Sequence, residues 1–353
     1  MTTRREALGL IGGAAAITVG ASLLSSDVLA NDGAPRVVRP LSTIDGPLER
    51  FAFGACLRYS DKADILTQVV AANPQLMVWL GDNIYADTAD MEVMRAKYAV
   101  LDRNPRFRAL SAACPQLATW DDHDFGEDNG GADYAPRATS QQRFLDFWKA
   151  SADDPRRTQE GVYSATTVGP PGQRVQFILL DGRYHRSPLK IGRRRTSTML
   201  GEIQWSWLEK QLETPAEIRF ICSGIQVINT DYRRWERWNI FPHERERLLS
   251  LVRDKRLPGC LLLSGDLHHA ELSRERRGFG YPAWELTMGG MDQREHGRWP
   301  NRRRVGKVYN KRGKFGFVRI SWGSDPTVHL EIRDKLGTPV IEQKVRLSTL
   351  QPG

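Results

Sequence analysis

The sequence predicts a layered α/β fold, and two recurring patterns carry that prediction. Short continuous apolar runs are typical of strands that are buried on both faces of a sheet. Segments with helical periodicity lie between several of these runs, an alternation that indicates packed layers of helices and strands. A length of 353 residues and a hydrophobic content of 40% suffice for one large domain with its own core.

Each of five apolar runs ends in a cluster of residues that can bind metal ions. The runs are residues 51–53, 76–80, 117–120, 175–180 and 261–263, and the clusters that follow them are 54–56, 81–85, 121–124, 181–185 and 264–269. In α/β sheets the ligand site lies beyond the carboxyl ends of the strands. We therefore expect these clusters, although far apart in the sequence, to meet at one place.

Periodicity also predicts the remaining elements. The segments expected to be helices are 62–72, 91–100, 141–149, 202–212 and 243–252. Three alternating segments near the C-terminus, 315–320, 327–332 and 340–345, are separated by turn residues. We expect them to be antiparallel strands that complete a second sheet.

The chain divides into three regions: residues 1–30, 31–49 and 50–348. The first resembles a twin-arginine signal peptide, with Arg4 and Arg5 before a weakly apolar run and small residues before a cleavage site. A permanent membrane anchor is the alternative, but the many glycines and alanines suit a stable span poorly. We expect export by the twin-arginine machinery to the periplasm or the medium, with no stable membrane insertion after cleavage. Residues 31–49 form an N-terminal segment, and residues 50–348 form the main domain.

The balance of charge indicates an anionic partner without selecting one. Against 42 Asp and Glu, 51 Lys and Arg leave a net charge of +9, which attracts phosphate esters, nucleic acids or anionic lipids. The four cysteines show neither CxxC pairs nor the dense spacing of a disulfide framework. Cys222 and Cys260 lie in apolar runs, where buried thiols are common.

The clusters fit the ligand pattern of dinuclear metal phosphoesterases, whose cations activate water and clamp the phosphorus during displacement. That pattern comprises Asp-x-His, Gly-Asp, Gly-Asn-His-Asp/Glu, a lone His and Gly-His-x-His. Asp82 fits the second part, and His123 fits the third with Asp122 in the place of asparagine. His268 fits the last part with Asp266 in the place of its first histidine. The first part is absent, and a cysteine occupies its place.

Six longer motifs carry a resemblance to one family. They are 54–56 (GAC), 79–88 (WLGDNIYADT), 119–126 (TWDDHDFG), 179–184 (LLDGRY), 200–208 (LGEIQWSWL) and 264–268 (SGDLH). Together they resemble the alkaline phosphatase D (PhoD-like) family of phosphatases and phosphodiesterases, within the metallophosphoesterase superfamily. The similarity covers roughly residues 50–345.

The resemblance implies a four-layer α/β/β/α metallophosphatase sandwich with a site for Fe3+ and calcium, although other divalent metals also suit such donors. By this resemblance Cys56, Asp82 and Tyr85 hold the iron, while Asp122 and Asp266 help to hold the calcium. Thiolate and phenolate suit ferric iron, and carboxylate oxygens suit calcium.

The histidines are carried over with more than one role open. His268 and His123 are each a metal ligand or an acid that stabilises the transition state; we expect His268 to bind metal and His123 to assist the leaving group. His269 stands where relatives often have an aromatic residue, and it could orient a ligand by a hydrogen bond. Gly182 stands where threonine is common, which affects the surroundings of the site rather than its class.

Several of the candidate ligands also have an ordinary structural interpretation. Asp82 could cap a turn, Cys56 could be a buried thiol, and Tyr85 could cover the edge of a sheet. The acidic residues at 121–124 could form a solvated turn, but neighbouring carboxylates repel one another unless cations are present. Adjacent side chains alternate in direction, so we select Asp122 and His123 from this run and keep Asp121 in reserve.

Two arginines after strand ends are the predicted catalytic and substrate-binding cations. Arg58 and Arg183 could clamp a phosphate with paired hydrogen bonds, or they could form surface ion pairs. Residues 232–238 mix basic and aromatic side chains and could form a substrate rim, a stacking surface or a lid with inward-facing Trp residues. Further ligand candidates are Gln226, Asn229 and Asp231.

The predicted function is hydrolysis of phosphate monoesters or diesters at alkaline pH, outside the cytoplasm. One alternative is a non-catalytic basic protein that binds anionic polymers or lipid and uses its metals structurally. Another alternative keeps the enzyme but makes its substrate a nucleic acid or a phospholipid. Convergence of ligands at strand ends favours an enzyme, since polymer binding does not require it.

Overall fold

The computed structural model describes residues 35–231, 236–295 and 300–353. The predicted signal peptide at 1–30 therefore lies outside the described residues, as does the larger part of the basic and aromatic segment at 232–238. Residues 35–353 form one compact unit. None of the helices in the described ranges is both long and apolar enough to cross a membrane.

The strands of the described chain form two sheets. They are β1 (Arg50–Gly54), β2 (Met77–Leu80), β3 (Gln116–Thr119), β4 (Ser164–Val168), β5 (Val175–Leu179), β6 (Ile218–Ser223), β7 (Cys260–Ser264), β8 (Ala270–Glu275), β9 (Ala283–Met288), β10 (Arg304–Tyr309), β11 (Lys314–Ser321), β12 (Thr327–Asp334) and β13 (Pro339–Arg346). One sheet has the order β13-β12-β11-β1-β2-β3, and the other has the order β10-β8-β9-β7-β6-β5-β4.

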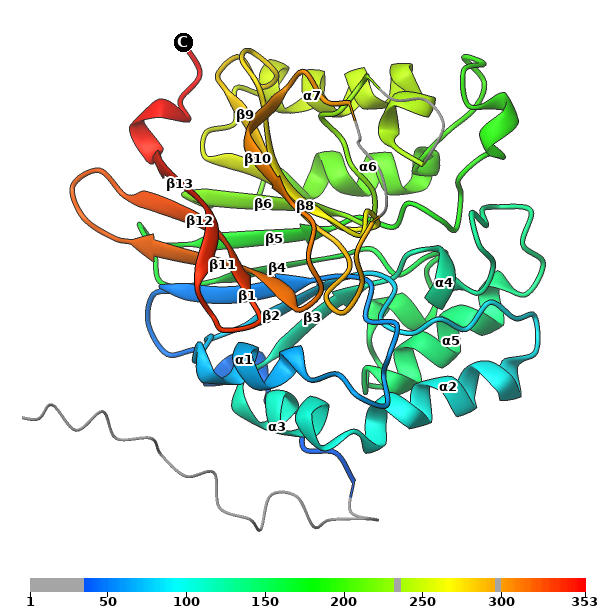
Figure 1. The fold of residues 1–353 in the computed structure, drawn as a ribbon. Helices are drawn as coiled ribbons and strands as arrows, with labels where there is room; N and C mark the ends of the chain where they lie inside the picture. Colours follow the sequence, from blue (N-terminus) through cyan, green and yellow to red (C-terminus); the bar gives the residue numbers. More distant parts are fainter. Residues whose placement is uncertain (1–34, 232–235, 296–299) are drawn as a thin grey trace, which may run out of the picture. The chain divides into compact units, whose positions relative to one another are not determined.

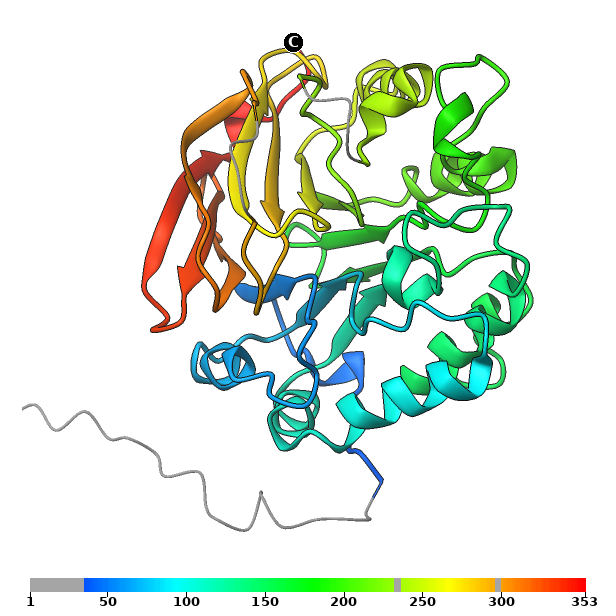
Figure 2. The same cartoon turned by 45° about the vertical axis from the view of Figure 1, so that its right-hand side comes forward.

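Helices cover the outer faces of both sheets (Figure 1). They are α1 (Ile65–Ala71), α2 (Met91–Arg103), α3 (Pro105–Ala113), α4 (Asp122–Phe125), α5 (Arg137–Phe147), α6 (Gly201–Gln211) and α7 (Pro242–Asp254), with short 3-10 turns at Leu41–Thr43, Pro155–Arg157, Leu189–Ile191, Trp238–Ile240 and Leu347–Thr349. Helices α1, α2, α3 and α5 lie against the six-stranded sheet, and α6 and α7 lie against the seven-stranded sheet (Figures 1 and 2). The result is the predicted α/β/β/α sandwich.

Aromatic side chains fill the space between the two sheets. Phe51 of β1 lies 4.9 Å from the ring centroid of Phe177 in β5 and 4.9 Å from that of Phe220 in β6. All three side chains are completely buried. Edge-to-face packing of this kind adds to the hydrophobic stabilisation of the core, and it fixes the two sheets face to face.

Strand direction brings the predicted clusters to one edge. Strands β1, β2 and β3 are parallel neighbours, as are β5, β6 and β7. Parallel strands end at the same edge of their sheet, so the residues that follow them are neighbours in space.

The C-terminal strands correct one sequence prediction. β11, β12 and β13 are antiparallel as expected, but they do not complete a second sheet. Strand β11 pairs with β1 in antiparallel orientation, with Phe53 opposite Gly316, and thereby extends the sheet of β1–β3. The alternating pattern indicates which face of a strand is buried. It does not indicate which strand pairs with it, because that depends on residues distant in the sequence.

A helix that periodicity missed lies between α2 and β3. Helix α2 ends before Asn104, whose side chain accepts hydrogen bonds from the amides of Arg106 and Phe107 and so caps α3. Pro105 occupies the first turn of α3, a position that tolerates proline. The two helices are therefore separate elements with no loop between them.

Candidate metal centre

The ends of four strands form the site. Cys56 follows β1, Asp82 follows β2, Asp122 follows β3 and Asp266 follows β7. The two sheets meet here, because Sγ of Cys56 donates a hydrogen bond to the backbone carbonyl of Asp266 at 3.2 Å. Residues 210 positions apart in the sequence thus lie side by side.

Three of these residues turn the chain sharply. Cys56, Asp82 and Asp266 have φ angles of 61°, 52° and 61°, in the left-handed region that non-glycine residues rarely occupy. Such strained backbone is concentrated at functional sites in proteins. Gly81 allows the close approach that the site needs, because a Cβ atom there would lie 2.4 Å from the Cβ of Asp121.

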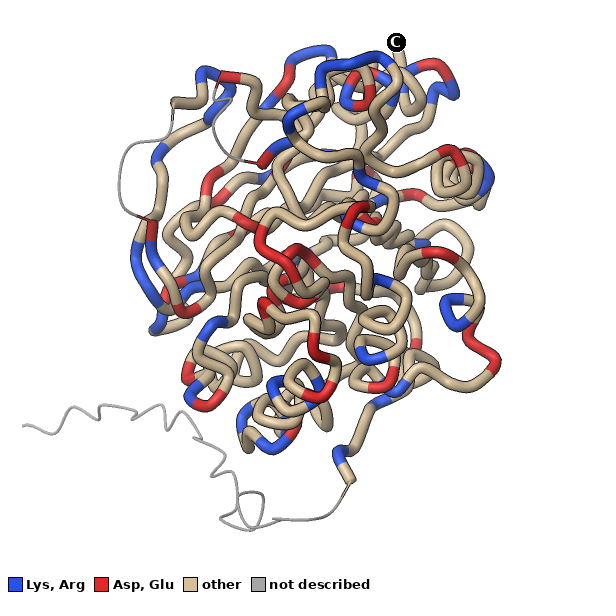
Figure 3. Tube along the Cα trace, turned by 90° about the vertical axis from the view of Figure 1, so that its right-hand side faces the viewer, with Lys and Arg blue, Asp and Glu red and all other residues tan. Residues whose placement is uncertain are grey.

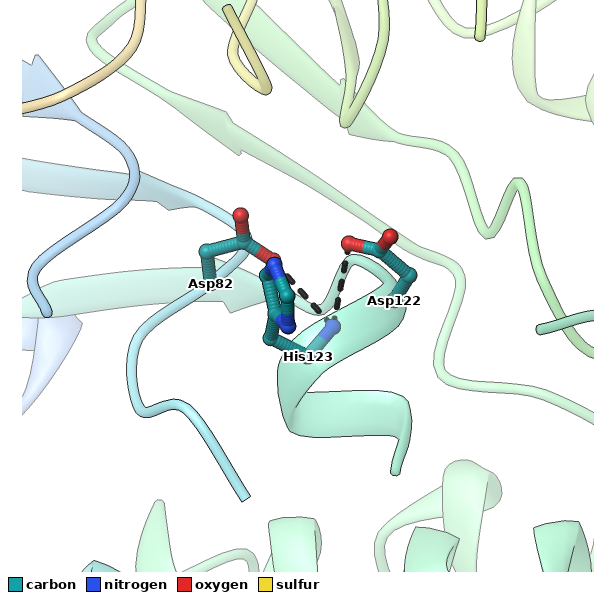
Figure 4. A group of neighbouring side chains, drawn as sticks. All are labelled: Asp82, Asp122 and His123. Carbon is teal, nitrogen blue, oxygen red and sulfur yellow. Dashed lines mark hydrogen bonds between the residues drawn. The ribbon is translucent and has the colours of Figure 1, made fainter. Parts of the chain in front are cut away.

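Asp82, Asp122 and His123 form a group with the geometry of a metal site. One ligand atom from each residue lies within 4.8 Å of the others. Figure 4 shows the two carboxylates on either side of the backbone amide of His123, which donates to Asp122 at 3.0 Å and to Asp82 at 3.3 Å. This amide holds both carboxylates in place between the loops that follow β2 and β3.

Tyr85 and His268 lie beside this group. The Tyr85 hydroxyl lies 3.2 Å from Nε2 of His268 and donates to Oδ2 of Asp82 at 3.4 Å. The compact group itself comprises Asp82, Asp122 and His123, so it includes a histidine that the sequence predicts as an acid. The other predicted ligands lie next to this group: Cys56, Tyr85, Asp266 and His268.

Negative charge is concentrated at this edge of the sheets. Figure 3 shows acidic residues gathered at the centre of the face onto which the strand ends open. Burial raises the pKa of Asp82 and of Asp266 well above the usual value, and neighbouring carboxylates raise each pKa further. Burial also raises the pKa of the Cys56 thiol, and the charges of Asp82 and Asp266 add to that effect.

Asp122 is the exception among the carboxylates. Burial acts to raise its pKa, but the charges of Arg183 and His123 outweigh burial and lower the pKa to about 2. Carboxylates crowded in this way favour bound cations. The thiol, phenol, imidazole and carboxylate donors of the site fit a transition metal together with a harder cation such as calcium.

Asp124 fixes the geometry of the loops and does not face the metal group. Its carboxylate accepts hydrogen bonds from the backbone amides of Asp121 at 2.7 Å, Asp82 at 3.1 Å and Asn83 at 3.2 Å. The side chain is completely buried, and burial raises the pKa of Asp124 to about 7. The expected alternation of adjacent side chains does not hold here, because residues 122–125 form helix α4 and the adjacent Asp122 and His123 lie in the same group.

Arg183 is completely buried, which does not support its predicted role in clamping substrate. Its guanidinium donates to Asp121 at 2.6 Å and pairs with Glu236 at 2.6 Å, and Glu236 also pairs with Arg186. Burial acts to lower the pKa of Arg183, but the charges of Asp121 and Asp122 raise it above the usual value. The alternative interpretation was a surface ion pair. Arg183 does form ion pairs, but they are buried, because a guanidinium away from water requires anionic partners.

Arg58 lies at the exposed edge of the site, beside Tyr85. Its side chain is exposed, and its guanidinium carbon lies 5.5 Å from the centroid of the Tyr85 ring. The backbone amides of Arg58 and Tyr59 donate to the carboxylate of Asp292 at 3.0 and 2.7 Å. The backbone is thus fixed while the guanidinium remains accessible at the edge of the metal group.

His123 is half-buried between Tyr85 and Asp87. Its Nδ1 lies 2.6 Å from Oδ1 of Asp87, and its ring centroid lies 4.1 Å from that of Tyr85. Burial acts to lower the pKa of His123, but the hydrogen bond to Asp87 and the charge of Asp122 outweigh it and raise the pKa. The histidine can therefore hold a proton beside the metal ligands.

Three supporting residues were not predicted as part of the site. Asp87 lies within the motif at 79–88, and that motif could have identified it as a residue of the site. Gln293 donates to the Tyr85 hydroxyl at 2.5 Å, and Nζ of Lys314 donates to the backbone carbonyls of His268 and Gln293 at 3.2 and 3.0 Å. No sequence pattern marks Gln293 or Lys314.

The remaining candidates lie apart from the metal group: His269, Gln226 and Asn229 are buried, and Asp231 is partly exposed. His269 is completely buried, with Nε2 3.8 Å from a carboxylate oxygen of Glu271. Gln226 donates to the same carboxylate at 2.7 Å, and Asn229 donates to Gln226 at 3.3 Å. Asp231 pairs with Arg302 at 2.5 Å. Gln226, Asn229 and Asp231 are therefore bound to protein groups rather than to the metal ligands, whereas neither ring nitrogen of His269 has a hydrogen-bond partner within the described residues.

The described end of the basic and aromatic segment faces inward. Glu236, Arg237 and Trp238 are buried, and the indole of Trp238 donates to Ser223 at 3.0 Å. Trp238 is therefore not an exposed stacking surface.

Comparisons with known proteins agree with this geometry. A family model described as PhoD-like phosphatase matches residues 51–318. The chain is 23% identical over 273 residues to alkaline phosphatase D of Bacillus subtilis (strain 168), an overlap that covers 63% of this chain and 46% of that protein. The chain thus matches less than half the length of this curated relative.

Solved structures show the same fold. A structure of PhoD has a TM-score of 0.63 at 20% identity, with 91% of this chain and 74% of that chain covered. Purple acid phosphatase PPD1 from yellow lupin (Lupinus luteus) seeds has a TM-score of 0.60 at 12% identity, with 86% and 54% covered. The metallophosphatase sandwich is therefore confirmed, and since the family model spans most of the sequence, the chain belongs to the PhoD-like phosphatase family.

Proposed function

We propose that this chain is a metal-dependent hydrolase of phosphate monoesters or diesters. The observation that carries the proposal is the convergence of Cys56, Asp82, Asp122 and Asp266 from four strand ends: Cys56 interacts with Asp82 and Asp266, and Asp266 interacts with Asp122. Membership of the PhoD-like phosphatase family supports it. A protein that only bound anionic polymers would not require these buried carboxylates to face one another.

The donor set supports iron and calcium as the cations. Cys56, Asp82 and Tyr85 would hold Fe3+, and Asp122 and Asp266 would hold calcium, with His268 as a further ligand beside the Tyr85 hydroxyl. When bound, the cations supply Lewis acidity, which activates water and neutralises charge on the phosphoryl oxygens. Other divalent metals that accept oxygen and nitrogen donors remain compatible with the same residues.

Three residues of the chain have separate tasks in the proposed reaction. The exposed guanidinium of Arg58 binds and orients phosphoryl oxygens. His123, whose Nδ1 bonds to Asp87, keeps its Nε2 available to donate a proton to the leaving oxygen. Arg183 acts indirectly, because it fixes Asp121 next to Asp122.

We also propose that the chain is exported. The support is the pattern at Arg4 and Arg5 and the small residues near position 30, which suit the twin-arginine machinery. Export would place the protein in the periplasm or the medium. Activity on diesters as well as monoesters belongs to the enzymatic proposal above. Fusion of residues 1–34 to a reporter, with Arg4→Lys/Arg5→Lys as the control, tests export: a reporter that remains in the cytoplasm would contradict it.

Hydrolysis assays test the enzymatic proposal directly. Metal-replete protein is expected to hydrolyse p-nitrophenyl phosphate, bis-p-nitrophenyl phosphate or both. Asp82→Ala is expected to lower kcat/KM by about 10³-fold, because it removes a ligand on which several kcal/mol of transition-state stabilisation depend. Asp45→Ala, which changes an exposed acidic residue, serves as the matched control.

Two outcomes would contradict this proposal. One is no turnover of either ester together with salt-dependent binding to anionic polymers, the behaviour of a non-catalytic basic protein. The other is full activity in Asp82→Ala. Elemental analysis of the purified protein checks the metals separately, with iron and calcium expected together.

A further inference from the structure

A cavity lies beside the metal centre, along the sheet from β1 toward β11. Its volume is about 430 Å³, and its wall includes Tyr59, Lys62, Asp292, Arg312 and Lys335. Arg312 lies in the turn before β11, and Lys335 lies in the turn between β12 and β13. Because β11 runs antiparallel to β1, the start of β11 lies at the end of β1, so this cavity opens at the same sheet edge as the metal ligands.

One short segment separates the cavity from the metal centre. Asp292 lines the cavity and accepts hydrogen bonds from the amides of Arg58 and Tyr59. The next residue, Gln293, donates to the hydroxyl of Tyr85. Arg58 and Tyr59 are likewise neighbours, one beside the Tyr85 ring and the other in the cavity wall. The two sites therefore share a wall.

The cavity has the chemistry of an anion site. Nζ of Lys62 lies 5.9 Å from the ring centroid of Tyr59, and the guanidinium carbon of Arg312 lies 5.8 Å from it. Tyr59 is 37% exposed, and Lys62, Arg312 and Lys335 are exposed as well. Two cations thus lie near one accessible aromatic ring, and a third, Lys335, lines the same cavity.

The two acidic side chains of the wall have partners other than these cations. Asp64 also lines the cavity, but it pairs with Arg106 at 3.0 Å, outside the cavity wall. The carboxylate of Asp292 is engaged by two backbone amides. Within the described part of the chain, neither carboxylate forms an ion pair with Lys62, Arg312 or Lys335, so the cations remain available to an anion.

We propose that this cavity, the Tyr59 pocket, binds a second phosphate group of the substrate while the phosphate to be cleaved lies at the metal centre. The inference rests on the proposed function and extends it to a substrate preference. Guanidinium and ammonium groups bind phosphate oxygens by charge-assisted hydrogen bonds. Phosphodiesters that carry a further phosphate on one alcohol are therefore preferred over diesters of an uncharged alcohol.

A matched pair of substrates tests the preference. Both are p-nitrophenyl phosphodiesters of glycerol, and one carries an additional phosphate on the glycerol. The full chain with its metals is compared with the double variant Arg312→Gln/Lys335→Gln. The kcat/KM ratio of the two-phosphate ester to the one-phosphate ester is expected to fall about tenfold, through KM, in that variant.

Two controls distinguish a direct contact in the Tyr59 pocket from general attraction by the net positive charge of the protein. Arg193→Gln/Arg194→Gln removes the same charge from exposed positions outside the cavity wall, and it is expected to leave the ratio unchanged. Arg312→Lys keeps the charge and is expected to retain most of the preference. Thermal unfolding of each variant checks that it is folded.

The outcomes distinguish this inference from the proposed function. Turnover of both esters with the same ratio in the wild-type chain and in Arg312→Gln/Lys335→Gln would overturn the Tyr59 pocket alone. An equal fall of the ratio in Arg193→Gln/Arg194→Gln would also overturn it, since general electrostatic attraction would then explain the preference. Turnover of neither ester by the wild-type chain would overturn the proposed function, and this inference with it.

Discussion

Two sides of the metal centre carry an arginine in opposite environments. On the open side, the guanidinium of Arg58 is exposed and lies over the ring of Tyr85. On the closed side, Arg183 is completely buried and bound by Asp121 and Glu236. Both arginines follow a strand end in the sequence, and the sequence predicts the same role for both. The difference in burial leaves Arg58 accessible to a substrate, whereas Arg183 supports the structure around the site.

The difference follows from the cost of burying charge. A guanidinium removed from water must be matched by anions and hydrogen-bond acceptors, and Asp121 and Glu236 supply them. An exposed guanidinium keeps its hydration and can exchange water for phosphate oxygens. Substitutions on the two sides should therefore affect different properties of the protein.

The largest effect is expected on the closed side, from Arg183→Met. This change leaves the buried carboxylates of Asp121 and Glu236 without their shared cation, which should lower the free energy of unfolding by about 3–5 kcal/mol. Denaturant unfolding monitored by circular dichroism measures it. If Arg183→Met had the same unfolding midpoint as the wild-type protein, Arg183 would not have the structural role that distinguishes it from Arg58.

The same substitution on the open side, Arg58→Met, is the matched comparison. It is expected to lower kcat/KM for p-nitrophenyl phosphate about tenfold to a hundredfold, the size of a lost charge-assisted hydrogen bond. The unfolding midpoint should stay near that of the wild-type protein, because an exposed side chain contributes little to stability. Unchanged kinetics in Arg58→Met would show that Arg58 does not contact the phosphate.

A smaller effect is expected from Asp87→Asn. The Asp87 carboxylate lies 2.6 Å from Nδ1 of His123 and fixes the orientation of that ring, a kind of support whose loss costs about 10- to 100-fold in metal-site activity. We expect the lower end of that range, because the Asp87 side chain is 44% exposed and water can replace it. Steady-state kinetics with Asp90→Asn as the control provide the measurement, and equal activity of both variants would contradict a role for Asp87.

The smallest effect is expected from Gln293→Ala. Its amide donates to the Tyr85 hydroxyl, and the net value of such a hydrogen bond is about 1 kcal/mol, or roughly a fivefold change in kcat/KM. Kinetic assays of Gln293→Ala beside Gln343→Ala, which changes a partly exposed glutamine of β13, measure it. A loss as large as that in Arg58→Met would mean that Gln293 itself contacts substrate.

The sequence predicted the layers because local patterns report burial. The run at 51–53 became part of β1, and the segment at 202–212 became α6 within a residue at each end. The predicted helix at 141–149 instead runs from Arg137, directly after Pro136, to Phe147. The sheet to which β11 belongs was wrongly predicted, since its pairing with β1 joins residues more than 260 positions apart.

The site was predictable to the extent that its residues follow strand ends. Cys56, Asp82 and Asp266 each lie in a motif that directly follows a strand, so the sequence alone could identify them as candidate ligands. The buried state of Arg183 was not, because Glu236 lies far along the chain and its contact depends on how the two sheets pack. Gln293 reaches Tyr85 across 208 positions for the same reason.

The left-handed corners at Cys56, Asp82 and Asp266 have a consequence for ion selection. Backbone hydrogen bonds hold them, from the amide of Cys56 to the carbonyl of Gly81 and from the amide of Leu57 to the carbonyl of Asp82. If these corners hold cations as proposed, their fixed backbone reduces the reorganisation needed on binding. Such a site would favour ions whose radius and preferred ligand number fit it.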